Sequence, residues 1–249
     1  MKKTIIINEN QRKRLLEARS DTFSLWVLSD IDDVEAKYRY CVKELGNPFS
    51  EGSSRVVFTL SDNLVLKLSY GKGKAGNAQN EAEYKVYETT KSKYVTRVLL
   101  HGKDFDWIVS ESVVPAEPID FEKIFNIPFR HTYSQGSKTG YDARETVGYD
   151  KYFDSIVPRG KISILSMGDI LEYIHYEVVI DDEWYDEEYE EVIENNEWLK
   201  GFREFVVNYN ISDFTSISNF GIVNRNGVET LILLDSGMND EVWENNYAF

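Results

Sequence analysis

Hydrophobic and polar residues alternate in short blocks through the first half of the chain, a pattern typical of antiparallel strands. The expected strands are rich in Val, Leu and Ile, are bounded by polar turns, and cover residues 54–60, 63–69, 95–101 and 107–113. Between the second and third strands, residues 77–91 place small and apolar side chains along one helical face. The pattern therefore predicts an antiparallel sheet with one inserted helix.

The second half of the chain has the longer period of helices. Residues 167–178 and 186–209 are expected to be helical, the second as one long amphipathic helix. A hairpin follows, because Asn226-Gly227 is a favoured tight turn and separates two apolar stretches. The second of these stretches, residues 230–234, runs directly into Asp235.

One lysine lies inside an apolar strand. Lys67 is flanked by Leu66 and Leu68, and burying its ammonium group is costly unless it meets an anion. Glu81 and Glu83 in the following helix are the candidate partners. They lie about 200° apart on a helix, so only one can face the lysine. The pattern favours Glu83 and leaves Glu81 open.

Three polar residues near the C-terminus occur in the order that kinase-like folds use for a metal–phosphate site. Asp213 is followed by Asn219, and Asp235-Ser-Gly237 ends the apolar stretch of the hairpin. Each short motif on its own is also typical of an ordinary turn. Their order after a strand lysine and a helix glutamate is what protein kinases share.

With these residues in this order, the chain resembles a divergent member of the protein-kinase-like superfamily, and more narrowly the small kinase-like proteins of bacteria and their phages. The resemblance covers roughly residues 48–125 and 197–240. It implies a minimal two-lobed α+β fold, with an antiparallel N-lobe sheet plus helix and a reduced, mainly helical C-lobe. The implied parts are an extension at 1–46, an N-lobe at 47–115, and a C-lobe at 116–249 with an insertion at 126–165.

The resemblance also implies the roles of ten residues. Nucleotide contacts are expected from a reduced phosphate loop, the strand lysine and the interlobe strand: Gly52, Ser53, Ser54, Lys67, Glu111 and Val113. The catalytic set is Asp213, Lys67 and Glu83. The expected ligands of Mg²⁺ are Asn219 and Asp235, because hard cations take oxygen ligands.

Several features depart from the kinase pattern. The loop keeps only Gly52 of the usual glycines, and Ile211-Ser212 replaces the His-Arg expected before Asp213. The spacing from Asp213 to Asn219 is one residue longer than usual, and Ser236 replaces the Phe of Asp-Phe-Gly. Only residues 238–249 follow this motif. A peptide-substrate platform like that of protein kinases is therefore not expected.

Composition limits the classes of binding partner and the compartments that are expected for this chain. The net charge is −15 with a pI near 4.7, which disfavours binding to nucleic acids and to anionic membranes. The single Cys41 and the lack of a long apolar segment favour the cytoplasm of a bacterium or infected host cell, or association with a virion. The tract Gly136-Ser-Lys-Thr-Gly140 lacks the upstream glycine of a P-loop and is interpreted as surface insertion.

Two hypotheses follow. The first is an ATP- and Mg²⁺-dependent phosphotransferase that moves the γ-phosphate to a hydroxyl of a protein or a small molecule. The second is a catalytically inactive pseudokinase that acts as a binding or virion-associated structural protein. The retained Lys67, Asp213, Asn219 and Asp235 favour activity.

Overall fold

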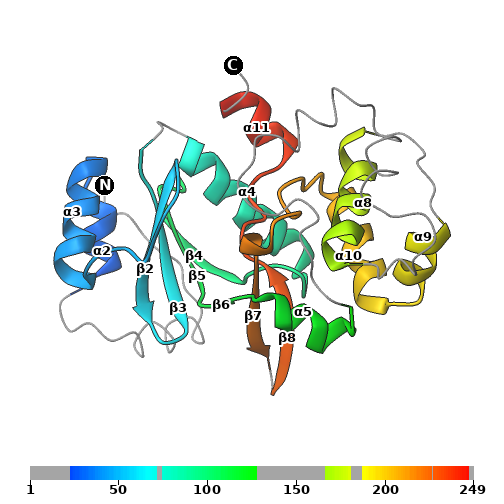
Figure 1. The fold of residues 1–249 in the computed structure, drawn as a ribbon. Coiled ribbons are helices and arrows are strands. Elements are labelled where there is room, and N and C mark those ends of the chain that lie inside the picture. Colours follow the sequence, from blue (N-terminus) through cyan, green and yellow to red (C-terminus); the bar gives the residue numbers. More distant parts are fainter. Residues whose placement is uncertain (1–22, 72–74, 128–165, 181–186, 226, 247–249) are drawn as a thin grey trace, which may run out of the picture.

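A five-stranded antiparallel sheet forms the N-terminal half of the molecule (Figure 1). The structure, a computed structural model, describes residues 23–71, 75–127, 166–180, 187–225 and 227–246. The strand order is β1-β2-β3-β5-β4. The strands are β1 (Ser50–Glu51), β2 (Arg55–Ser61), β3 (Leu64–Ser69), β4 (Val98–His101) and β5 (Trp107–Glu111).

The two faces of this sheet are covered by different helices. Every residue of β3 is buried, and because side chains alternate along a strand, Leu66 and Lys67 point to opposite faces. Helices α2 (Leu25–Asp30) and α3 (Val34–Leu45) cover the face that carries Leu66. Helix α4 (Ala75–Thr90) covers the face that carries Lys67.

The C-terminal half joins a small sheet to a group of helices. Strand β6 pairs with β7, and β7 forms a hairpin with β8 through a two-residue loop. These strands are β6 (Val114–Pro115), β7 (Phe220–Arg225) and β8 (Val228–Leu233). The helices are α5 (Pro118–Phe125), α8 (Met167–Ile180), α9 (Glu187–Glu194), α10 (Glu197–Asn208), η1 (Ile217–Asn219) and α11 (Asp240–Asn246).

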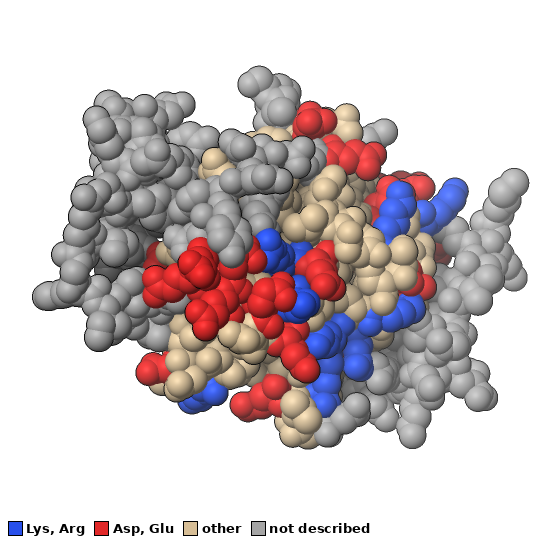
Figure 2. Space-filling view, turned by 90° about the vertical axis from the view of Figure 1, so that its right-hand side faces the viewer, with Lys and Arg blue, Asp and Glu red and all other residues tan. Residues whose placement is uncertain are grey.

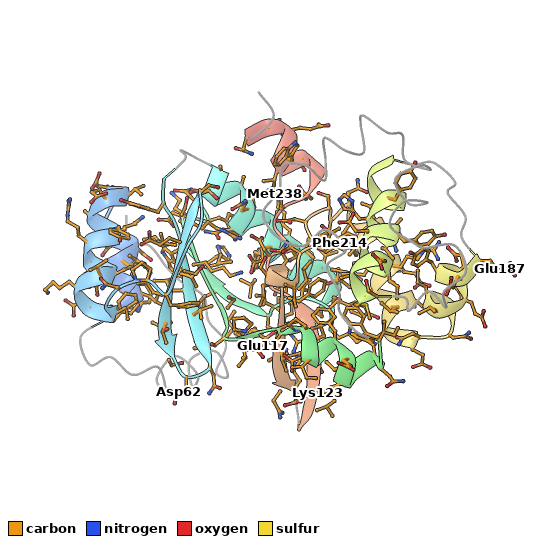
Figure 3. All side chains as sticks on the ribbon, viewed as in Figure 1. Asp62, Glu117, Lys123, Glu187, Phe214 and Met238 are labelled. Carbon is orange, nitrogen blue, oxygen red and sulfur yellow. The ribbon has the colours of Figure 1, made fainter. Side chains whose placement is uncertain are left out.

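Aromatic side chains form the core of the C-terminal half. Phe202 of α10 stacks on Trp198 with ring centroids 4.7 Å apart and meets Phe214 edge-on at 5.5 Å. Phe214 is fully buried and also contacts His175 of α8. It lies near the centre of the molecule, between the hairpin and these helices (Figure 3). Because Phe214 follows Asp213 in the chain, this packing fixes the backbone next to the predicted catalytic residue.

The predicted fold class is confirmed. An antiparallel N-terminal sheet, one helix between its third and fourth strands, and a helical C-terminal part with a hairpin give the kinase-like order of elements. The predicted hairpin at Asn226-Gly227 is also present, since Arg225 pairs with Val228. The predicted insertion, apart from residues 126–127, lies outside the described residues.

One predicted element is wrong. Residues 186–209 do not form a single helix, because α9 ends at Glu194 and α10 begins at Glu197. The Asn196 side chain accepts hydrogen bonds from the backbone N–H groups of Trp198 and Leu199, both at 3.0 Å. An asparagine that caps a helix in this way starts a new helix, which a periodicity argument does not detect.

Acidic side chains gather on the face of the molecule that lies on the side of α9 and α10 (Figure 2). The first turn of α9 alone carries Glu187, Glu188 and Glu190. Lys and Arg side chains lie beside the acidic ones on the same face (Figure 2). Among the described helices, none combines the length and apolar character needed to cross a lipid bilayer.

We expect Asn196→Ala to lower the free energy of unfolding by about 1 kcal/mol, because two backbone N–H groups of α10 lose their acceptor. Urea unfolding of the variant measures this loss. Asn195→Ala is the matched control, since that exposed residue only donates its backbone N–H to Glu191. Equal losses in the two variants would contradict the capping role.

Candidate functional site

Lys67 and Glu83 form a buried ion pair between the sheet and α4. The Lys67 ammonium lies 2.6 Å from Glu83 Oε1 and donates a second hydrogen bond to the Leu234 carbonyl at 2.9 Å. Glu83 has no solvent exposure, and its Oε1 also accepts a hydrogen bond from the Thr96 hydroxyl at 3.0 Å. The lysine therefore links β3 to α4 and to the segment that follows β8.

The choice between the two helix glutamates is settled by their positions on α4. Glu83 faces the sheet, whereas Glu81 pairs with Lys85 one turn along the helix surface at 2.8 Å. Both side chains of the Glu81–Lys85 pair are exposed. Glu83 is thus the partner of Lys67, as the pattern of the helix favoured.

Arg55 is the main residue of the site that sequence reasoning missed. Its guanidinium donates to Glu83 Oε2 at 2.9 Å and to Asn80 Oδ1 at 3.2 Å, and it forms a salt bridge with the Asp235 carboxylate. The residue is 8% exposed. In the sequence it ends the tract Gly52-Ser-Ser-Arg55 of the expected phosphate loop, and no ion pair is expected for it there. Its partners lie 25, 28 and 180 positions away along the chain, so no local sequence pattern indicates them.

Asp235 follows β8 and faces the two cations. Its Oδ1 accepts the Gly237 N–H at 3.1 Å, and its Oδ2 contacts Arg55. Burial opposes its ionisation, but the charges of Arg55 and Lys67 outweigh that effect and hold the pKa of Asp235 below its ordinary value. A Cβ on Gly237 would lie 2.3 Å from the Gln79 carbonyl, so only glycine lets this segment pack on α4.

Asp213 and Asn219 contact each other close to Asp235. The Asn219 amide nitrogen donates to Asp213 Oδ1 at 2.6 Å and to its backbone carbonyl at 3.1 Å. Partial burial raises the pKa of Asp213, although the residue as a whole is exposed, and the nearby charge of Asp235 raises it further. Asn219 thus orients Asp213, a role that differs from the metal ligation expected from the sequence.

The predicted phosphate loop is tied to the start of α4. Gly52 and Ser53 are exposed, but Ser54 is buried and its hydroxyl donates to Gln79 Oε1 at 2.7 Å. The Ser54 carbonyl accepts the Tyr70 N–H at 2.8 Å, and a Cβ on Gly76 would lie 2.3 Å from it. The hydroxyl hydrogen of Ser54 is therefore committed to the protein, whereas the Ser53 side chain faces solvent.

The predicted interlobe strand is held by an arginine from the hairpin. Glu111 pairs with Arg225, and its Oε1 accepts the Arg97 N–H at 2.8 Å. Arg225 also donates to the carbonyls of Lys93 at 2.9 Å and Val95 at 2.8 Å. The carboxylate of Glu111 thus ties the two halves together. Its predicted nucleotide contact, and that of Val113, stay predictions.

The arrangement does not fit a divalent metal ion at Asp235. One oxygen of this carboxylate accepts a backbone N–H and the other contacts Arg55. Among the described residues, no group of three or more His, Cys, Asp or Glu side chains is placed to hold a metal. Mg²⁺ usually takes one or two carboxylates, and here the positive charge of Arg55 already lies against the predicted one.

A separate hollow of about 370 Å³ lies between α4 and α11. It is lined by residues of the outer face of α4, such as Glu81 and Lys85, and by residues of α11, such as Glu241 and Val242. None of the predicted site residues lines it. The chemistry expected from the sequence therefore belongs to the opposite, sheet-facing side of α4.

No protein-family profile and no curated protein sequence matches the chain. Among solved structures, it is similar to a ternary complex of APH(2")-IIa with streptomycin and ATP, with a TM-score of 0.31 and 16% sequence identity over 83% of this chain and 71% of the other. A gentamicin complex of APH(2")-IIa gives a TM-score of 0.29 and 16% identity over 82% and 70% of the two chains.

A complex of APH(2")-IIia with GDP and kanamycin gives a TM-score of 0.28 and 11% identity, covering 77% of this chain and 66% of the other. The strand order and the ion pairs that meet at Glu83 are features of this chain itself.

We expect Glu83→Gln to lower the free energy of unfolding by about 3–5 kcal/mol, because Lys67 and Arg55 would stay buried without their shared carboxylate. Thermal unfolding at neutral pH measures the loss. Glu81→Gln is the matched control on the same helix, and its exposed pair is worth at most about 0.5 kcal/mol. Comparable losses in both variants would show that Glu83 has no special role.

Asp213→Asn and Asp235→Asn are expected to change stability in opposite directions. The raised pKa of Asp213 means that its charge disfavours the folded state above that pKa, so Asp213→Asn raises the melting temperature at neutral pH. The gain disappears as the pH falls below the unfolded value of about 3.9, where both states are protonated.

The lowered pKa of Asp235 has the opposite effect on stability. Its charge stabilises the fold above about pH 3.9 and stops doing so as the pH falls through the lower folded value. Asp235→Asn therefore lowers the melting temperature at neutral pH. Melting curves of both variants and the wild type, recorded from neutral pH to about pH 4, test the two signs. Shifts of the same sign would contradict this account.

Proposed function

We propose that the chain is an ATP-dependent, kinase-like phosphotransferase that moves the γ-phosphate to a hydroxyl group. The observation that carries this proposal is the buried Lys67–Glu83 pair. It lies beside Asp235, close to the hydrogen-bonded Asp213 and Asn219. A lysine fixed by a buried carboxylate is a positioned point charge, which suits the binding of phosphate oxygens.

The transfer step assigns one role to each group. A bond forms between the acceptor oxygen and the γ-phosphorus while the bond to the bridging oxygen of ADP breaks. The acceptor proton passes to the Asp213 carboxylate, whose raised pKa makes it a better base than an ordinary aspartate. Asn219 keeps that carboxylate oriented. The acceptor is a hydroxyl of a protein or of a small molecule.

The second candidate is a binding protein without turnover. The Arg55–Asp235 contact favours it, because a kinase-like site that uses a metal at this aspartate cannot do so while the arginine is there. A pseudokinase of this kind binds nucleotide or a protein partner, including one in a virion, and transfers no phosphate to an acceptor. The two candidates therefore differ in whether phosphate is transferred.

We expect ATP at about 100 times its dissociation constant to stabilise the protein by about 2.7 kcal/mol, a shift of several degrees in melting temperature for a chain of this size. Lys67→Met should abolish the shift. Lys37→Met is the matched control, since Lys37 is an equally buried lysine paired with Asp106 outside the site. Measurements in Mg²⁺ and in EDTA are both needed, and no wild-type shift in either would end the proposal.

Asp213→Asn then separates the two candidates. The variant should keep the ATP-dependent shift and lose transfer of labelled γ-phosphate to hydroxyl acceptors. Wild-type protein that binds ATP and transfers no phosphate to any acceptor tested would favour the binding protein.

A further inference from the structure

Arg55 occupies the position at which a kinase-like site would place a cation against Asp235. Its guanidinium reaches Glu83 and Asn80 on α4 and Asp235 after β8. It lies at the first position of β2, so the sheet fixes its backbone. The side chain is therefore held from three sides, unlike a flexible surface arginine.

The charges of the buried cluster are already balanced. Lys67 and Arg55 carry two positive charges, and Glu83 and Asp235 carry two negative charges. A divalent ion at Asp235 would add two positive charges directly beside the guanidinium of Arg55, and the exposed carboxylate of Asp213 nearby could offset only one of them. Loss of Arg55 would instead leave one carboxylate in excess, which is the condition that attracts a cation.

The chemistry of arginine makes this cation permanent. A guanidinium stays protonated at any physiological pH and presents several N–H groups in a rigid plane. One plane can therefore hold the carboxylates of Glu83 and Asp235 at the same time. Lysine has a compact ammonium on a flexible chain and would retain the charge with less geometric control.

We propose that Arg55 is the resident cation of the site: it binds Asp235 in place of a divalent metal ion, and the protein binds nucleotide phosphates without one. The second part of this inference rests on the proposed function, whereas the exclusion of metal from Asp235 does not. Arg55 is thus a positioning residue that sets the cation specificity of the site.

Mn²⁺ alone, with no nucleotide, is the first probe. Its free concentration is measured by electron paramagnetic resonance during titration of wild-type protein, Arg55→Gln, Arg55→Lys and the double variant Arg55→Gln/Asp235→Asn. We expect Arg55→Gln to bind one more equivalent of Mn²⁺ than the wild type, at least about tenfold more tightly than the acidic surface does. Arg55→Lys and the double variant should lack this added site.

Two results would overturn the inference. One is equal Mn²⁺ binding by the wild type and a folded Arg55→Gln. The other uses Asp235→Asn, with Arg55 in place, and so covers the case in which Arg55→Gln does not fold. This variant should bind as much Mn²⁺ as the wild type does. Weaker Mn²⁺ binding by the variant would show that Asp235 holds metal beside Arg55. Circular dichroism establishes which variants are folded.

The nucleotide part is tested by melting the wild type with ATP in EDTA and in Mg²⁺. Equal shifts support metal-free binding, and a shift that needs Mg²⁺ overturns it. No shift under either condition removes the proposed function and with it the metal-free binding of nucleotide. The Mn²⁺ titration still decides whether Arg55 excludes metal, so the two failures are distinguishable.

Discussion

The arrangement of the site depends on one buried carboxylate. Glu83 is fully buried and receives Lys67 from β3, Arg55 from β2 and the hydroxyl of Thr96. Taking a charge out of water is costly unless it is paired and hydrogen-bonded, so these donors must be in place whenever α4 packs on the sheet. The position of α4 and the positions of both cations are thereby fixed together.

The two cations then fix the C-terminal half against the sheet. Arg55 reaches Asp235 and Lys67 reaches the Leu234 carbonyl, both directly after β8. At the other end of the hairpin, Arg225 contacts Glu111 and two backbone carbonyls of the segment before β4. The hairpin is thus held at both ends, and Asp213 and Asn219, which precede it in the chain, lie close to Asp235.

Local patterns explain which parts of this could be predicted from sequence. A lysine between leucines requires an anion, and helical spacing limits that anion to one face of α4. The Lys67–Glu83 pair can therefore be predicted from the sequence. The Asn226-Gly227 turn can be predicted in the same way, from its two residues alone. The Arg55–Asp235 contact joins residues 180 positions apart, and the sequence around each residue does not indicate its partner. The break between α9 and α10 depends on one capping side chain, which a hydrophobic period does not register.

A buried ionic cluster of this kind is poorly explained by stability alone. Replacing such a network with apolar side chains is often neutral or stabilising, and the face of the sheet that meets α2 and α3 shows that this chain packs leucines well. On the opposite face it keeps two cations, two carboxylates and the buried amides of Gln79 and Asn80. Beside them, Asp213 retains a carboxylate whose charge is disfavoured by partial burial and by Asp235. Ionisable groups held at such cost are typical of functional sites.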